Sequence, residues 1–197
     1  MSTSIAIFVF EGVEELDFVG PWEVLRVWEQ MAPEEAAVRV FTVAAADGTI
    51  TCAKGLRIVP DETWASAPPI DVLVYPGGMG TRAHIGDEAV RSWVRDVATH
   101  GALLTSVCTG SLVYADAGLL DGRPATTHWA SLDDLAALGR DIDVRPDDRY
   151  VDSGGVITAS GVSAGIDMAL HLVRRLDTEE RARRIRRYIQ YDPQPPV

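Results

Sequence analysis

The sequence contains few cysteines and no long apolar run. Its two cysteines, Cys52 and Cys108, lie far apart and form no C-x-x-C pair. They therefore supply neither a disulfide framework nor a thiolate zinc site, and they fit a reducing compartment such as the cytoplasm. No stretch approaches the roughly 20 apolar residues that a membrane span needs. The N-terminus also lacks the basic segment of a signal peptide, so we expect a cytoplasmic protein without a membrane partner.

Positive charge is also scarce. The chain has 18 Lys and Arg residues against 29 Asp and Glu residues, which gives a formal net charge of −11. Phosphate binding needs a concentrated basic face, so this balance argues against a nucleic-acid partner. The arginines between 181 and 187 are interpreted as one solvated helix face. The chain reaches Val197 without a basic helix-turn-helix extension, and we expect it not to bind DNA.

Strand-like and helix-like segments alternate along the 197 residues. Short apolar runs predict buried strands, and longer amphipathic stretches between them predict helices. The alternation predicts a single α/β domain over residues 1–197, a flavodoxin-like three-layer sandwich with a mainly parallel sheet and helices on both faces. The predicted strands are Ser4–Phe10, Val38–Ala45, Ile70–Tyr75, Ala102–Leu104, Asp143–Val144, Tyr150–Asp152 and Val156–Ala159, with a small hairpin over Gly48–Pro60. The predicted helices are Trp22–Gln30, Asp87–His100, Leu112–Ala117, Ser131–Leu138, Gly161–Leu176 and Glu179–Tyr188.

The rest of the chain is organised around the segment 102–118, which is typical of a strand, a sharp turn and a helix. Cys108 stands at the turn, with Ser106 and Gly110 as small residues two positions away on either side. The same steric pattern underlies the nucleophile elbow of serine hydrolases. A cysteine at a helix N-terminus is expected to have a depressed pKa, so we predict that Cys108 alkylates faster than Cys52. Burial of Cys108 as a small apolar residue is the alternative.

Three further sites are candidates for the same edge of the sheet. Asp17 lies near a predicted helix start, Gly77 and Gly78 follow the strand that ends at Tyr75, and His128 follows a short strand-like segment. Each also has a purely structural interpretation: a helix N-cap, a plain turn and a locally satisfied loop histidine. Ligands of such sheets bind at the carboxyl ends of the strands, which favours one site centred on Cys108.

Four motifs extend over nearly the whole chain: LDFVGPWEVL (16–25), VYPGGMGTR (74–82), TSVCTGSLVYADAGLLDGRPATTHW (105–129) and TASGVSAGIDMALHLV (158–173). They resemble the DJ-1/PfpI superfamily, whose fold is related to the class I glutamine amidotransferases. The resemblance implies Cys108 as nucleophile, Asp17 as its acidic partner and Thr109 beside it. It also implies a substrate or oxyanion cradle from Gly77, Gly78 and Gly161, and an assisting role for His128.

Within the superfamily, the aspartate of L-D-x-x-G-P with C-T-G-S and A-T-T-H-W resembles isonitrile hydratases and the ligand domain of AraC-type regulators. Deglycase and glyoxalase subfamilies usually carry glutamate at the position of Asp17, which makes those activities less favoured here. The resemblance implies a hydratase that converts an isonitrile into an N-substituted formamide through a thioimidate on Cys108, without a metal or organic cofactor. The alternatives are a glyoxalase or amidase, and a small-molecule or redox sensor. Relatives are commonly dimers, so we expect a homodimer.

Overall fold

A seven-stranded sheet forms the centre of the molecule. The computed structural model of the chain describes residues 2–194, so the predicted domain, 1–197, extends beyond the described residues by Met1 and 195–197. The strands follow the spatial order β10-β11-β7-β6-β1-β2-β5, and all neighbours are parallel except β10 and β11. Their bounds are Thr3–Phe8 (β1), Val38–Ala44 (β2), Glu62–Thr63 (β5), Val72–Tyr75 (β6), Leu103–Val107 (β7), Tyr150–Asp152 (β10) and Val156–Ala159 (β11).

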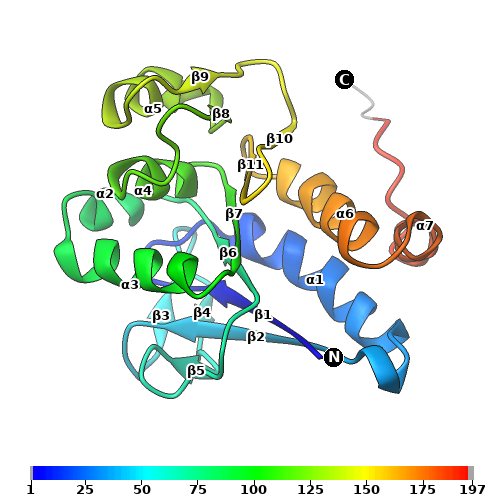
Figure 1. Cartoon of the computed structure of the whole chain (residues 1–197). Coiled ribbons are helices and arrows are strands. Elements are labelled where there is room, and N and C mark those ends of the chain that lie inside the picture. Colours follow the sequence, from blue (N-terminus) through cyan, green and yellow to red (C-terminus); the bar gives the residue numbers. More distant parts are fainter. Residues whose placement is uncertain (1, 195–197) are drawn as a thin grey trace.

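Helices cover both faces of this sheet, as predicted for a three-layer sandwich (Figure 1). One face carries α1 (Glu15–Met31), α6 (Ala164–Leu176) and α7 (Glu179–Tyr188), which pack against one another. The opposite face carries α3 (Glu88–Thr99) and α4 (Gly110–Asp116), with α2 (Thr81–His84) and α5 (Leu132–Leu138) packed against α4. Within residues 2–194, no helix has the length and apolar character needed to cross a membrane.

The central strands are buried on both faces because helices cover each side. Every residue of β6 and β11 is buried, and so are the last four residues of β1. Continuous apolar runs, rather than alternating ones, are what such strands require. Together with the strand pairing given above, this burial confirms the predicted mainly parallel sheet.

Helix α1 differs from the prediction at its start. The sequence suggested a helix from Trp22, after Pro21, but the helix begins at Glu15 and contains Pro21 in its interior. A proline there removes one intrahelical hydrogen bond, the one its N–H would make to the carbonyl of Asp17. The buried face of α1 stabilises the helix in spite of this loss. Asp17 consequently lies in the first helical turn, and it is not the N-cap residue, which is Glu14.

Smaller elements account for the remaining differences. The strand expected at Ala102–Leu104 runs from Leu103 to Val107, which brings its carboxyl end directly to Cys108. The predicted hairpin exists as the antiparallel pair β3 (Ile50–Thr51) and β4 (Arg57–Ile58). The predicted strand Asp143–Val144 (β9) pairs outside the central sheet, in parallel with β8 (Pro124–Ala125). Edge strand β5 and helix α2 were not predicted, because two to four residues carry little periodic signal.

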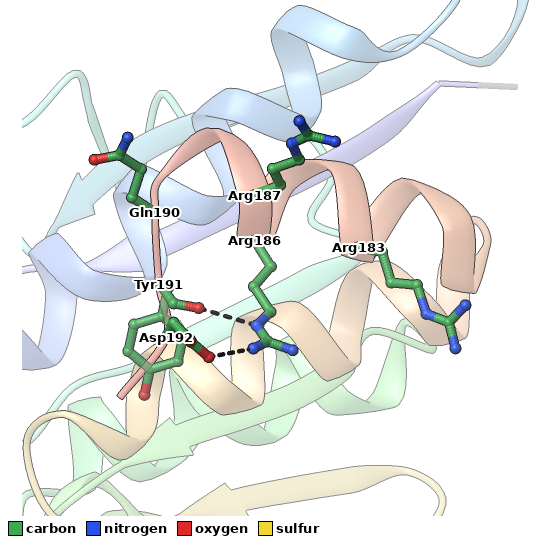
Figure 2. Close-up of a pocket in the computed structure, with 6 residues that line it drawn as sticks. All are labelled: Arg183, Arg186, Arg187, Gln190, Tyr191 and Asp192. Atoms are coloured by element: carbon green, nitrogen blue, oxygen red, sulfur yellow. Dashed lines mark hydrogen bonds and ion pairs between the residues drawn. The ribbon is translucent and has the colours of Figure 1, made fainter. Parts of the chain in front are cut away.

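Most arginines of helix α7 form a solvated face, as expected, and they line a surface depression of about 390 Å³ (Figure 2). Arg186 donates to the backbone carbonyl of Tyr191 at 2.9 Å and to the Asp192 carboxylate at 2.6 Å. Arg181 is the less exposed member and binds Asp177. None of the residues predicted for the functional site lines this depression.

Candidate active site

Cys108 occupies a strained turn between β7 and α4. Its φ angle of 57° lies in the left-handed region that residues with a side chain rarely adopt. Its N–H donates to the carbonyls of Ala159 and Ser160 at 3.1 and 3.0 Å. Its carbonyl accepts hydrogen bonds from the hydroxyls of Ser111 and Thr127 at 3.1 and 2.9 Å. These bonds on both sides of the residue hold the strained conformation. The predicted sharp turn between a strand and a helix at Cys108, the geometry of a nucleophile elbow, is therefore confirmed.

Two glycines allow the neighbouring chain segments to approach this turn. A Cβ atom on Gly110 would lie 2.1 Å from the Tyr75 carbonyl oxygen, and one on Gly77 would lie 2.5 Å from the Thr109 backbone nitrogen. Both obstacles are backbone atoms, which cannot rotate away as a side chain could. The glycines therefore let the ends of β6 and β7 come together behind Cys108.

The first turn of α1 brings Asp17 to Cys108. The Asp17 side chain is fully buried, and its Oδ2 accepts the N–H of Gly77 at 2.9 Å. Its Oδ1 has no partner with full hydrogen-bond geometry among residues 2–194. The carboxyl also interacts with the Cys108 thiol. A buried carboxyl oxygen without a full partner, beside a thiol, is suited to exchange a proton with a ligand.

The pKa of Asp17 is raised to about 7, chiefly because burial penalises the charged form. The negative charge of Glu14 acts in the same direction. The N–H of Gly77 and hydrogen bonding with the Cys108 thiol oppose the shift. Asp17 therefore changes its protonation state near neutral pH, which suits a group that both accepts and donates protons.

The pKa of Cys108 is raised to about 12, first by burial and then by the charge of Asp17. The backbone N–H groups of Thr109 and Val162 stabilise the thiolate and lower this pKa, but they do not outweigh the two raising effects. The prediction that the Cys108 thiol has a depressed pKa is therefore wrong. The helix terminus is outweighed because the thiol is 6% exposed and an acid lies next to it. Proton transfer to Asp17, rather than a resting thiolate, is the available route to a nucleophile.

Val162 belongs to the site and was not identified from the sequence. Its φ of 47° is unusual for a β-branched residue, and its N–H acts on the Cys108 sulfur. The strained turn at 160–163, just before α6, points this N–H at the thiol. The small residues Ser160, Gly161 and Ser163 around it were the available signal for a turn. Nothing local indicated that the turn would meet Cys108.

Gly77 and Gly78 lie at the site but are not free oxyanion donors. The N–H of Gly77 is engaged by Asp17, and the N–H of Gly78 donates to Thr109 Oγ1 at 3.0 Å. Thr109 Oγ1 also accepts from the Thr81 hydroxyl at 3.0 Å. The expectation that these two glycines cradle a substrate or oxyanion is therefore corrected. Their N–H groups instead position the side chains of Asp17 and Thr109. The donors directed at the Cys108 sulfur are the N–H groups of Thr109 and Val162.

His128 lies beside the site without a hydrogen bond to Cys108 among the described residues. Its Nδ1 accepts the N–H of Ala130 at 3.3 Å. Its ring packs against Gly161, where an added Cβ would meet His128 Cδ2 at 2.5 Å. Gly161 thus makes room for the imidazole, and His128 adjoins the turn that contacts the thiol.

A cavity of about 330 Å³ lies between this turn and the loop 146–149. Val162, which contacts the sulfur through its N–H, forms part of its wall. Trp129 lies on its rim and is 76% exposed. The lining residues are Thr127, His128, Trp129, Pro146, Asp147, Asp148, Arg149, Ser160, Gly161 and Val162. The cavity is large enough for a small ligand, and Val162 connects it to Cys108, which is not itself among the lining residues.

Cys52, the second cysteine, is buried in the β3–β4 hairpin. No group of three or more His, Cys, Asp or Glu side chains within residues 2–194 could hold a metal ion.

Comparisons with known proteins agree with this geometry. Residues 3–175 match the model of the DJ-1/PfpI family. The chain is 36% identical over 205 residues to an isonitrile hydratase of Pseudomonas putida, covering 100% of this chain and 82% of that protein. It is 30% identical over 172 residues to the HTH-type transcriptional regulator GbdR of Pseudomonas aeruginosa, covering 87% of this chain but only 46% of the regulator.

Among solved structures, a ThiJ/PfpI family protein of Pseudomonas syringae superposes with a TM-score of 0.89 at 33% identity, covering 100% of this chain and 78% of that one. The elbow cysteine, its buried aspartate and the matched residues lead to one assignment: the chain belongs to the DJ-1/PfpI family.

Proposed function

We propose that this protein is a cysteine-dependent isonitrile hydratase, which adds water to an isonitrile R–NC to give the formamide R–NH–CHO. The observation that carries the proposal is the buried pair of Asp17 and Cys108 at the elbow, where the acid has a pKa raised to about 7. The full-length similarity to an isonitrile hydratase supports the same reaction.

The first half of the reaction forms a carbon–sulfur bond. Ionised Asp17 takes the proton of the Cys108 thiol, and the sulfur attacks the terminal carbon of the isonitrile. The N–H groups of Thr109 and Val162 stabilise the sulfur's negative charge during this step. The carbon becomes nucleophilic as the bond forms, and Asp17 delivers the same proton to it. The product is the thioimidate R–N=CH–S on Cys108, and Asp17 is ionised again.

The second half hydrolyses this thioimidate. Asp17 accepts a proton from water as the hydroxyl attacks the same carbon, and the nitrogen gains that proton. The tetrahedral adduct then collapses: the carbon–sulfur bond breaks, the hydroxyl proton returns to the sulfur through Asp17, and the formamide leaves. One water is consumed and the Asp17–Cys108 pair is restored, so no redox partner is needed.

The cavity beside Val162 suits the substituent of the substrate. Its Trp129 rim offers an exposed aromatic face, which favours an aromatic or bulky apolar group on the isonitrile nitrogen. His128 lies on the same wall and contacts the substituent in this arrangement, rather than the sulfur.

The test is turnover of an aryl isonitrile to its formamide, measured by liquid chromatography and mass spectrometry. We expect wild type and Cys52→Ser to be active, and Cys108→Ser to lose at least about a thousandfold. We expect Asp17→Asn to lose about 10²- to 10⁴-fold, as for a missing general acid–base. The wild-type rate should rise with pH through about 7, as Asp17 loses its proton.

An inactive wild type would contradict the hydratase proposal. Methylglyoxal is then the next substrate, because Cys108-dependent consumption of it would favour the glyoxalase alternative. Binding of an isonitrile without turnover would favour a sensor.

The predicted homodimer remains part of this proposal. Sedimentation velocity at micromolar concentration checks it, and a single monomer species would contradict it.

A further inference from the structure

A second cavity, of about 500 Å³, lies away from the elbow. It is formed where the chain leaves β1 and β2, and α2 and the start of α3 close its other side (Figure 1). Its lining residues are Phe8, Val9, Phe10, Glu11, Ala44, Ala45, Ala46, Asp47, Gly48, Thr49, Ile50, Trp64, His84, Asp87, Ala89 and Val90. Asp17, Cys108 and Thr109 are not among them. Its size is that of an ordinary small-molecule site.

Aromatic rings form one wall of this second cavity. Phe8 stacks on Trp64 with ring centroids 5.9 Å apart, and Phe10 meets the ring of His84 at 4.5 Å. Trp64 is held from behind by Trp93, at 4.9 Å. Phe8 and Phe10 are 1% and 6% exposed, so they support the wall from within. The half-buried Trp64 is the ring that can meet an apolar ligand.

The charged groups in the lining are of one sign. Glu11, Asp47 and Asp87 contribute carboxylates, and the lining includes no Lys or Arg. Burial lowers the pKa of His84, so its imidazole adds no positive charge at neutral pH. Its Nδ1 is shared with the Tyr75 hydroxyl at 2.7 Å. The lining therefore favours a cation over an anion.

One of these carboxylates is free to meet a ligand. Glu11 accepts the N–H of Thr51, and Asp87 caps α3 through the N–H groups of Ala89 and Val90. Asp47 makes no hydrogen bond or ion pair within residues 2–194 and is exposed. An unpaired carboxylate at the rim of an aromatic cavity is a natural partner for an ammonium group.

We propose that this second cavity binds a small organic ammonium ion with an aromatic or alkyl body, its ammonium group at Asp47. The apolar body lies against the Trp64 side chain. Such a site is separate from the nucleophile and does not depend on the hydratase activity.

Isothermal titration calorimetry of the whole protein at pH 7 tests this with three matched probes. 2-Amino-1-phenylethanol carries the ammonium, 1-phenylethane-1,2-diol replaces it with a hydroxyl, and 2-hydroxy-2-phenylacetate replaces the aminomethyl group with a carboxylate. We expect the amine to bind at least about fivefold more tightly than the diol, and the anion not to bind.

Two variants locate the bound amine. Asp47→Asn should weaken it about three- to fivefold. Asp148→Asn, which removes an acid from the cavity beside Val162, should leave the affinity for the amine unchanged. Equal binding of amine and diol, no binding of the amine, or loss on Asp148→Asn with none on Asp47→Asn would each overturn the proposal. Because the readout is binding, an inactive hydratase would not affect the result.

Discussion

Cys108 and Cys52 are both buried free thiols, 6% and 3% exposed, but their surroundings differ. Cys108 is held at a positive φ by hydrogen bonds on both sides, and two backbone N–H groups and one acid face its sulfur. Cys52 sits in an ordinary hairpin, where burial raises its pKa and the charges of Glu15 and Glu11 add to the shift. Burial alone therefore does not distinguish the proposed nucleophile, Cys108, from the packed thiol of Cys52. The difference lies in directed donors and a proton acceptor within reach.

The largest expected difference between the Cys108 elbow and the Cys52 hairpin is in the stability lost when a glycine is replaced, because the backbone is packed more tightly at the elbow. Gly110→Ala at the elbow places a Cβ 2.1 Å from the Tyr75 carbonyl oxygen, and we expect it to destabilise the protein by about 3 kcal/mol or more. Gly55→Ala in the Cys52 hairpin meets no atom within 4 Å, and strain at φ +94° should cost about 1–2 kcal/mol. Urea denaturation of both variants measures this, and equal losses would contradict the packing difference.

Asp17→Asn should remove activity but increase stability. A buried acid whose folded pKa is about 7, above the ordinary aspartate value of 3.8, binds more protons when folded than when unfolded between those values. Stability is therefore lost as pH rises from about 4 to 7. Asparagine can still accept from Gly77, so the variant should be about 2–4 kcal/mol more stable than wild type at pH 8.

At pH 4 the advantage of Asp17→Asn should largely vanish, because wild-type Asp17 is then protonated when folded and only about half ionised when unfolded. Unfolding in urea at pH 4 and pH 8 gives both values. The same advantage at both pH values would mean that Asp17 does not titrate as inferred. A substitution near Cys52, Glu11→Gln, serves as the control, since its carboxylate is exposed and should show no comparable gain.

The pH profile of alkylation should separate the two thiols by about tenfold or more. In wild type, the Cys108 thiolate forms by proton transfer to Asp17, so its rate with iodoacetamide should rise to about pH 7 and then level off. In Asp17→Asn that acceptor is absent, and the rate should continue to rise with pH, exceeding wild type above pH 8. Peptide mass spectrometry distinguishes Cys108 from Cys52, which should label slowly in both proteins. A wild-type profile without a plateau would contradict proton transfer from Cys108 to Asp17.

The smallest expected effect concerns a single hydroxyl. Thr127→Val removes one of the two donors to the Cys108 carbonyl, and we expect a loss of about 1 kcal/mol with reduced turnover. Ser111 retains the other donor. Thr51→Val in the hairpin should change stability by less than about 0.5 kcal/mol, because its hydroxyl has no such partner within residues 2–194. Thermal unfolding and turnover of both variants check this, and a fully active Thr127→Val would show that the second donor is dispensable.

Much of the architecture could be predicted from local patterns. Strands buried on both faces require continuous apolar runs, and the runs at Ser4, Val38, Ile70 and Val156 identified them. The Cys108 turn was predicted because small residues must flank a sharp bend. The start of α1 was missed because Pro21 is usually a first-turn residue, and only the packing of α1 against the sheet and α6 explains its interior position.

The sequence by itself determined the fold class, the elbow and the identity of its cysteine, because these depend on residue size and hydrophobic periodicity over short spans. The tertiary structure alone decided the charge state of the site. Asp17 is buried against Cys108, and the Val162 N–H that contacts the sulfur comes from a turn 54 positions further along the chain. No local sequence pattern relates these segments. Desolvation and charge act through space, so a thiol that the helix terminus predicted to be acidic has instead a raised pKa.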